Sequence, residues 1–258
     1  MPTRSDGGGQ GVRTATWPPV SGLEIVFVAL AALLGGAAQS ILGFGVAFTT
    51  VPALALTTPE LIPGAPLVAF LPMTVAMAFR ESKQIDRDAA IRVAVARVPG
   101  IALGTLAVLV LSADGISVAV AVVMLVAVIS TGLGWTVSVT PANERLAGLV
   151  SGFSGTATGL GGPPLAVLYR HRSPGEVRPT LASIFVPGIL LALLGLALTG
   201  SLTLLQVQTG LVLAVAVATG MVVATPLLTR LSDETVRAGL LVWAGGGSLA
   251  ALGQVLLG

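Results

Sequence analysis

The stretch "SILGFGVAFTTVP", residues 40–52, lies in the middle of the first long apolar segment of a 258-residue chain. Two glycines flank Phe44, two threonines follow, and Pro52 closes the stretch. Glycine in a helix interior costs about 1 kcal/mol relative to alanine, and proline costs about 3 kcal/mol. We therefore expect a helix to break here, at the depth where a membrane helix would lie deepest in lipid.

The composition around this stretch is that of an integral membrane protein. The chain is 54% hydrophobic and 9% charged, with a mean hydropathy of +0.97, whereas soluble domains carry roughly 25% charged residues. A membrane span requires about 20 apolar residues, and runs of this kind fill the chain from Leu23 to Leu257. We predict an all-α polytopic membrane protein without a soluble domain. Residues 1–21, which are polar and rich in Gly, Ser and Thr, are expected to form a disordered tail and not a cleaved signal.

The distribution of basic residues tests how these runs cross the bilayer. Polar and Pro/Gly clusters delimit eight apolar runs, at 23–56, 61–79, 89–111, 115–136, 145–169, 179–199, 203–229 and 235–257. The loop "RESKQIDRDAAIR" is the densest in basic residues and is therefore placed in the cytoplasm. If every run crosses, eight of the 13 Lys and Arg residues lie inside, whereas eleven do so if runs 23–56 and 145–169 re-enter. We expect each half to contain one broken or re-entrant element and about three spans, which inverts the second half relative to the first.

An internal repeat supports this division. "GGAAQSILGFGVAFTTVP" begins at residue 35, and "SGFSGTATGLGGPPLAVL" begins at residue 151. A shift of 116 residues pairs the glycines of the two motifs and, further along, Gly104 with Gly220, while "LSADGISV" from residue 111 matches "LSDETVRA" from residue 231 at a shift of 120. We predict two related membrane repeats, 22–136 and 142–257, that together form one transport domain.

The two glycine motifs are the candidate binding site. Backbone groups freed by a helix break cost several kcal/mol each in lipid, so they must face protein or water. Transporters use such breaks to direct N–H groups at a solute, and these donors suit an anion. The alternative is that the glycines only permit close helix packing. The candidate residues are the glycines of the two motifs together with neighbouring amide-, hydroxyl- and phenyl-bearing side chains: Gln39, Ser40, Gly43, Phe44, Gly45, Thr49, Thr156, Thr158, Gly159, Gly161 and Gly162.

The sequence does not indicate a catalytic site, a metal site or a cofactor site. The chain has no cysteine, its one histidine (His171) stands in a charged loop, and no carboxylate lies in the middle of a run, so we expect no enzymatic activity, no metal, no cofactor and no nucleic acid partner. Arg97 is the only basic residue well inside a run. Either it snorkels to the cytoplasmic interface, or it lines a vestibule and attracts an anion.

The chain resembles the TauE/SafE family of sulfite exporters, also described as DUF81-type transporters. The resemblance rests on "GGAAQSILGFGVAFTTVPAL", on "GFSGTATGLGGPPLAVLY", and on the basic loop followed by "IRVAVARVPGIALGTL". It implies an inner-membrane carrier for small anions such as sulfite or short sulfonates. The first motif departs from the glycine-rich form of the family at Phe44 and Val46, whose bulk narrows the site.

The leading hypothesis is therefore a secondary transporter that moves a small anion, sulfite or a short organosulfonate, by alternating access across the plasma membrane. Its partners would be the anionic solute and the lipid bilayer, its main basic loops would be cytoplasmic, and a homo-oligomer is left open. Two other classes remain open from the sequence. One is an anion channel that uses the same breaks as a filter, and the other is a membrane scaffold that does not transport.

Overall fold

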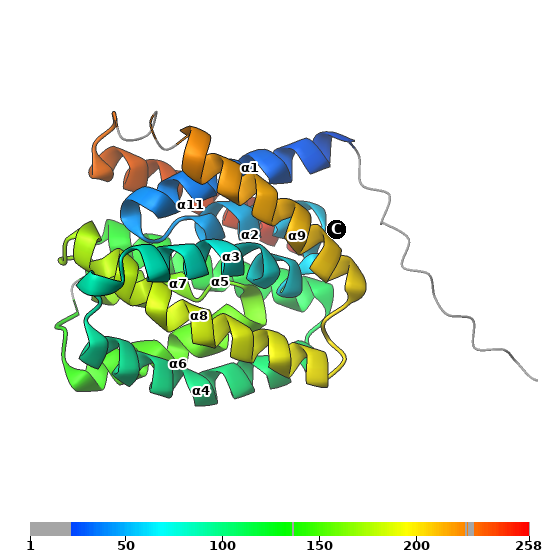
Figure 1. Ribbon diagram of the computed structural model, residues 1–258. Helices are drawn as coiled ribbons and strands as arrows, with labels where there is room; N and C mark the ends of the chain where they lie inside the picture. The colour runs from blue at the N-terminus through cyan, green and yellow to red at the C-terminus, as the bar shows by residue number, and fades with distance from the viewer. Residues whose placement is uncertain (1–21, 136, 225, 227–229, 258) are drawn as a thin grey trace, which may run out of the picture.

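The computed structural model describes residues 22–135, 137–224, 226 and 230–257 (Figure 1). The tail predicted at residues 1–21 lies outside this part of the chain. Within it the protein is helical throughout, as predicted. The helices are α1 (Gly22–Leu42), α2 (Val46–Thr57), η1 (Pro59–Leu61), α3 (Gly64–Arg80), η2 (Ser82–Gln84), α4 (Arg87–Val110), α5 (Ala113–Gly132), α6 (Pro141–Thr158), α7 (Gly162–Leu168), α8 (Pro174–Leu198), α9 (Leu204–Thr219), the π-helical turn η3 (Gly220–Ala224) and α11 (Asp233–Leu257).

Six of the described helices are long and apolar enough to cross a membrane, which confirms the prediction of a polytopic membrane protein. They are α1, α4, α5, α8, α9 with its continuation to residue 223, and α11. Helix α3, which corresponds to the span expected at 61–79, has 17 residues and belongs with α2 to the shorter apolar helices. In Figure 1 the long helices lie side by side in one bundle.

Both glycine motifs interrupt the helices, as the sequence predicted. Helix α1 ends before Gly43, and α2 begins after Gly45; these glycines have φ angles of 81° and 154°. Helix α6 ends at Gly159, whose φ of 76° is left-handed, and α7 begins at Gly162. Left-handed backbone costs a residue with a Cβ about 1–2 kcal/mol, so these positions favour glycine.

Each broken element folds back on itself. In the first, a Cβ at Gly35 would lie against Val46 and Thr49, so that the start of α2 runs alongside the second half of α1. In the second, the Ser154 hydroxyl donates a 2.8 Å hydrogen bond to the Leu160 carbonyl oxygen, and Gly155 lies against Gly161. The chain therefore reverses at both breaks instead of continuing along one axis.

The helix packing in the two halves follows one scheme. Helix α1 packs against α9 as α6 packs against α4, and α2 packs against α11 as α7 packs against α5. Likewise α3 packs against α9 as α8 packs against α4. The principal contacts are therefore reproduced when α1, α2, α3, α4 and α5 are exchanged for α6, α7, α8, α9 and α11 in that order.

Close backbone contacts at glycines show the same correspondence. A Cβ at Gly36 would meet the Val217 carbonyl, and a Cβ at Gly152 would meet that of Arg97. These contacts pair residues 36 and 152 at the predicted shift of 116, and residues 97 and 217 at a shift of 120.

A second pair of close contacts relates Gly220 to Gly100. A Cβ at Gly220 would meet the Leu33 carbonyl, and one at Gly100 would meet that of Leu149. These contacts match Gly220 with Gly100, whereas the sequence repeat pairs Gly220 with Gly104. The difference of four residues is close to one helical turn of 3.6 residues, so an alignment at either shift places a glycine on the same face of the helix.

Ion pairs tie the loops together at one end of the bundle, on the left in Figure 1. Arg178 contacts Glu81 at 3.2 Å, and Arg172 contacts Asp86 at 2.8 Å. Asp86 also caps α4, and the Ala89 N–H together with the Arg172 guanidinium holds the pKa of the Asp86 carboxyl below its ordinary range. Polar contacts thus fix the connection between α3 and α4 to the start of α8.

Candidate anion-binding site

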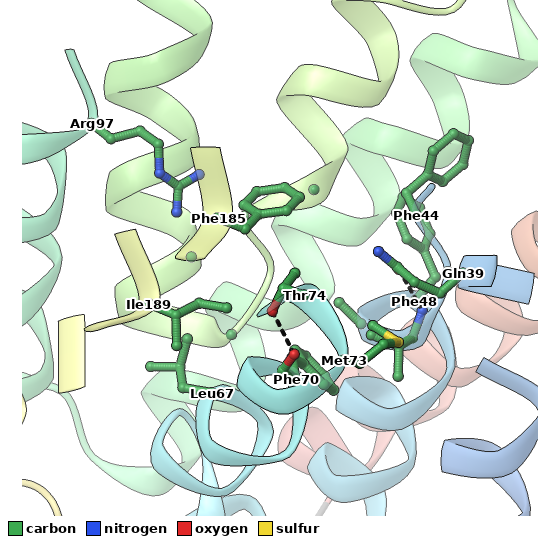
Figure 2. A pocket seen from close by; sticks show the side chains of 17 residues that line it. Gln39, Phe44, Phe48, Leu67, Phe70, Met73, Thr74, Arg97, Phe185 and Ile189 are labelled. Atoms are coloured by element: carbon green, nitrogen blue, oxygen red, sulfur yellow. Dashed lines mark hydrogen bonds between the residues drawn. The ribbon is translucent and has the colours of Figure 1, made fainter. Parts of the chain in front are cut away.

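A cavity lies where the two helix breaks meet, with about 510 Å³ of space between atoms when the open solvent at its mouth is included. Figure 2 shows Arg97 on one side of this cavity and Gln39, Phe44 and Phe48 on the other, with Phe185 and Thr74 between them. The lining comes from both breaks and from α1, α2, α3, α4, α6, α7 and α8: Gln39, Phe44, Gly45, Val46, Ala47, Phe48, Leu67, Phe70, Met73, Thr74, Arg97, Gly155, Gly159, Gly161, Gly162, Phe185 and Ile189.

Arg97 is the only charged residue in this lining as described, and its side chain lies inside the protein. The residue is 4% exposed, so the snorkelling interpretation is wrong. The reason is that α4 packs face to face with α6 and α8 at this depth. Gly152 on α6 lies against the Arg97 backbone, and Gly188 on α8 leaves room for the guanidinium, because a Cβ there would lie 2.8 Å from Nε.

The guanidinium of Arg97 has little compensation from the protein. Its Nη1 donates a hydrogen bond to the Ser151 hydroxyl, and its Cζ lies 5.0 Å from the centroid of the Phe185 ring. Its Nε is buried and has no hydrogen-bond partner among the residues that the structure describes. In the part of the chain that the structure describes, Arg97 forms no ion pair. A buried charge without a counter-charge costs several kcal/mol, and an anion in the cavity would offset part of that cost.

Ser151 connects this charge to the second break. Its hydroxyl accepts from Arg97 and donates to the Gly161 carbonyl oxygen at 2.5 Å. Ser151 therefore links the Arg97 guanidinium to the backbone of the second break through two hydrogen bonds. Ser151 was not among the site residues predicted from sequence, although it opens the second glycine motif.

The first break is stabilised by Gln39, which is 5% exposed. Its Nε2 donates to the Gly43 carbonyl oxygen at 2.8 Å, and its Oε1 accepts from the Val46 N–H at 3.3 Å. The carboxamide thus satisfies backbone groups that the break leaves open. The rings of Phe44 and Phe48 follow, with centroids 5.9 Å apart.

The structure brings seven of the predicted site residues together in the cavity lining: Gln39, Phe44, Gly45, Arg97, Gly159, Gly161 and Gly162. The other five lie outside it. The hydroxyls of Ser40, Thr49 and Thr158 donate to carbonyl oxygens of their own helices, at 2.7, 3.2 and 2.7 Å. Gly43 packs against Arg178. Thr156 lies beside Gly104, and its buried hydroxyl has no hydrogen-bond partner among the described residues.

Residues of α3 and α8 complete the site and were missed by the sequence analysis. They are mostly apolar: Leu67, Phe70, Met73, Thr74, Phe185 and Ile189. The Thr74 hydroxyl donates to the Phe70 carbonyl oxygen at 2.6 Å. Sequence carried no signal for these positions, because an apolar side chain in a membrane helix can face lipid, another helix or a cavity alike.

A family model described as sulfite exporter TauE/SafE matches residues 28–250. The chain belongs to the TauE/SafE sulfite exporter family. Comparisons with curated proteins and with solved structures gave no match. Members of the TauE/SafE family are membrane transporters and not enzymes. Together with the six apolar helices, membership identifies a multi-pass membrane protein that takes part in transport.

Proposed function

We propose that this TauE/SafE protein is a secondary carrier for a small oxyanion, sulfite or a short organosulfonate, which binds in the cavity between the two helix breaks. One observation carries the proposal. Arg97 is buried without a carboxylate partner among the described residues, in a cavity that both breaks line.

The lining favours an anion with a compact charged group. A guanidinium offers paired N–H donors that match two oxygens of an oxyanion, and Arg97 has an unpaired Nε. Away from Arg97 the wall is formed by aromatic and aliphatic side chains such as Phe48, Phe70 and Met73. A sulfonate could place its oxygens at Arg97 and a short apolar group against these rings.

Alternating access would arise from an inverted repeat. The matching contact scheme of the two halves supports a duplicated unit, and a unit with an odd number of crossings is inverted in its second copy. Inverted repeats in secondary transporters bind solute between the copies and expose it to the two sides in turn. The loops that hold most of the basic residues, among them 80–92, would face the cytoplasm of a plasma-membrane protein.

Transport by purified protein in liposomes tests this function. A carrier is expected to give saturable uptake of radiolabelled sulfite or sulfoacetate, accelerated by the same anion on the opposite side. Unitary currents that do not saturate in this way would establish a channel instead. Correctly folded protein that moves neither anion in either direction would contradict the proposal and favour a scaffold.

Alanine at Gly159 and Gly161 separates the carrier from the scaffold. A double variant that remains folded in the membrane but does not transport is expected for a binding site, since both glycines line the cavity. Intact transport with loss of assembly would instead indicate that the glycines serve only helix packing.

A further inference from the structure

A second pocket adjoins the central cavity and also contains arginines. It has about 380 Å³ of space between atoms when open solvent is included, and it lies between the first break, α5, α7 and α11. Phe44 and Phe48 line both this pocket and the central cavity. Figure 2 shows these two rings at the side of the central cavity that lies away from Arg97.

The charges of the second pocket are all positive among the described residues. Its lining contains Arg170, which follows α7, and Arg237, from the start of α11, and no described carboxylate. The Arg170 Nη1 donates to the Trp135 carbonyl oxygen at 3.1 Å. The Arg237 Nε is buried and finds no hydrogen-bond partner in the described part of the chain, and the Arg237 Cζ lies 5.7 Å from the centroid of Phe44.

We propose that this pocket is a second oxyanion site, with Arg237 as the principal contact and Arg170 as a supporting charge. The observations at Arg237 and Arg170 do not depend on the central cavity. Two guanidinium groups without a described acidic partner repel each other and attract an anion, and an unpaired buried N–H calls for an acceptor. Only the class of ligand, a small oxyanion, rests on the proposed function.

The shared phenylalanines give the second site a role in transport. The rings of Phe44 and Phe48 lie between Arg237 and the central cavity, since they belong to both linings. The pocket is therefore an outer subsite at the end of the bundle where α11 begins and α7 ends (Figure 1). An anion held there would need to pass the two rings to reach Arg97.

Equilibrium binding of sulfite, measured by calorimetry on the full chain in nanodiscs of zwitterionic lipid, tests the proposal. We expect two binding sites in the wild type. Arg237→Gln is expected to leave one site, or to weaken the second at least tenfold, which corresponds to about 1.4 kcal/mol. Arg230→Gln is the matched control, because Arg230 is exposed near the same end of the bundle and does not line the pocket.

Arg97→Gln distinguishes failure of this proposal from failure of the proposed function. If both hold, the variant loses the central site and retains the one at Arg237. If Arg237→Gln binds as the wild type does while Arg97→Gln loses a site, the second-site proposal is overturned alone. If Arg97→Gln binds as the wild type does and Arg237→Gln loses a site, the central site is overturned alone. Absence of any sulfite binding overturns both.

An anionic lipid headgroup offers similar chemistry to the same arginines, and the lipid arm of the experiment separates the two sources. Two sulfite sites that persist in nanodiscs containing phosphatidylglycerol support a site for a small oxyanion. Loss of the second site in those nanodiscs alone assigns the pocket to a lipid phosphate and overturns the proposal.

Two further measurements guard against a variant that fails to fold. Arg237→Lys keeps the charge and is expected to retain a weakened second site. Phenylglyoxal labelling uses only the wild type: sulfite should slow modification of Arg237 several-fold and leave that of Arg230 unchanged. Equal labelling rates at Arg237 with and without sulfite would overturn the proposal.

Discussion

Replacing Arg97 by methionine separates two effects of its buried charge: the effect on the stability of the protein and the effect on anion binding. Methionine is similar in length and apolar, so it fills the space between α6 and α8 without a charge. The side chain it replaces is 4% exposed and forms no ion pair with any described residue. We expect opposite effects of Arg97→Met on stability and on anion binding.

The structure sets the size of the two effects. Exchanging buried ionic groups for apolar ones of similar volume is neutral or stabilising by about 1–4 kcal/mol. This range is already net of the hydrogen bonds that the buried ionic groups make, which for Arg97 is the one to Ser151, and the Ser151 hydroxyl keeps Gly161 as its acceptor. The free energy of unfolding of the empty protein should therefore stay the same or rise. A hydrogen bond to a charged group contributes about 1.5–3 kcal/mol, so affinity for sulfite should fall about 10- to 150-fold.

Thermal unfolding without anion and a titration of transport against sulfite concentration measure these effects, with Arg230→Met as the exposed control. Arg97→Met should melt at or above the wild-type temperature and lose the stabilisation that sulfite gives the wild type. A variant that melts lower and transports sulfite with an unchanged half-saturating concentration would refute the reasoning, because Arg97 would then be a structural residue.

Three further predictions concern the packing and the polar end of the bundle. Gly152→Ala should destabilise the protein by about 1–3 kcal/mol, because its Cβ would meet the Arg97 carbonyl, whereas Gly246→Ala, whose Cβ meets open space, should unfold no earlier than the wild type. Gly159→Ala should cost about 1–2 kcal/mol, since its φ is +76°, and should slow transport in liposomes; unchanged melting would contradict the strain. Because the folded-state pKa of Asp86 is lowered from 3.8, its contribution to stability is present above pH 3.8 and is lost as the pH falls through the lowered value. The melting temperatures of wild type and Asp86→Asn should therefore converge at low pH, and a constant difference would contradict this.

The helix breaks could be predicted from sequence because their cause is local. Gly43, Gly45 and Gly159 have positive φ angles, and a run of such residues is costly in a helix wherever the helix lies. The orientation of neighbouring hydroxyls was not predictable in this way. A Ser or Thr in a helix can donate to a carbonyl one turn earlier instead of facing a cavity, as Thr49 and Thr158 do.

The burial of Arg97 depends on residues far away in the chain. Sequence placed Arg97 inside an apolar run, but its exposure is decided by Gly152 and Gly188, which belong to helices that pack on α4 only in the folded protein. The partner of Arg97, Ser151, is likewise brought in by that packing. Such long-range contacts leave no periodic signal in a single sequence.

The most direct test of the central claim is a diffraction measurement on crystals of the full chain grown with selenite, the heavier analogue of sulfite, at the selenium absorption edge. We predict an anomalous peak in the cavity between the two breaks, within hydrogen-bonding distance of the Arg97 guanidinium. A saturating concentration of selenite that leaves this cavity without a peak would contradict it.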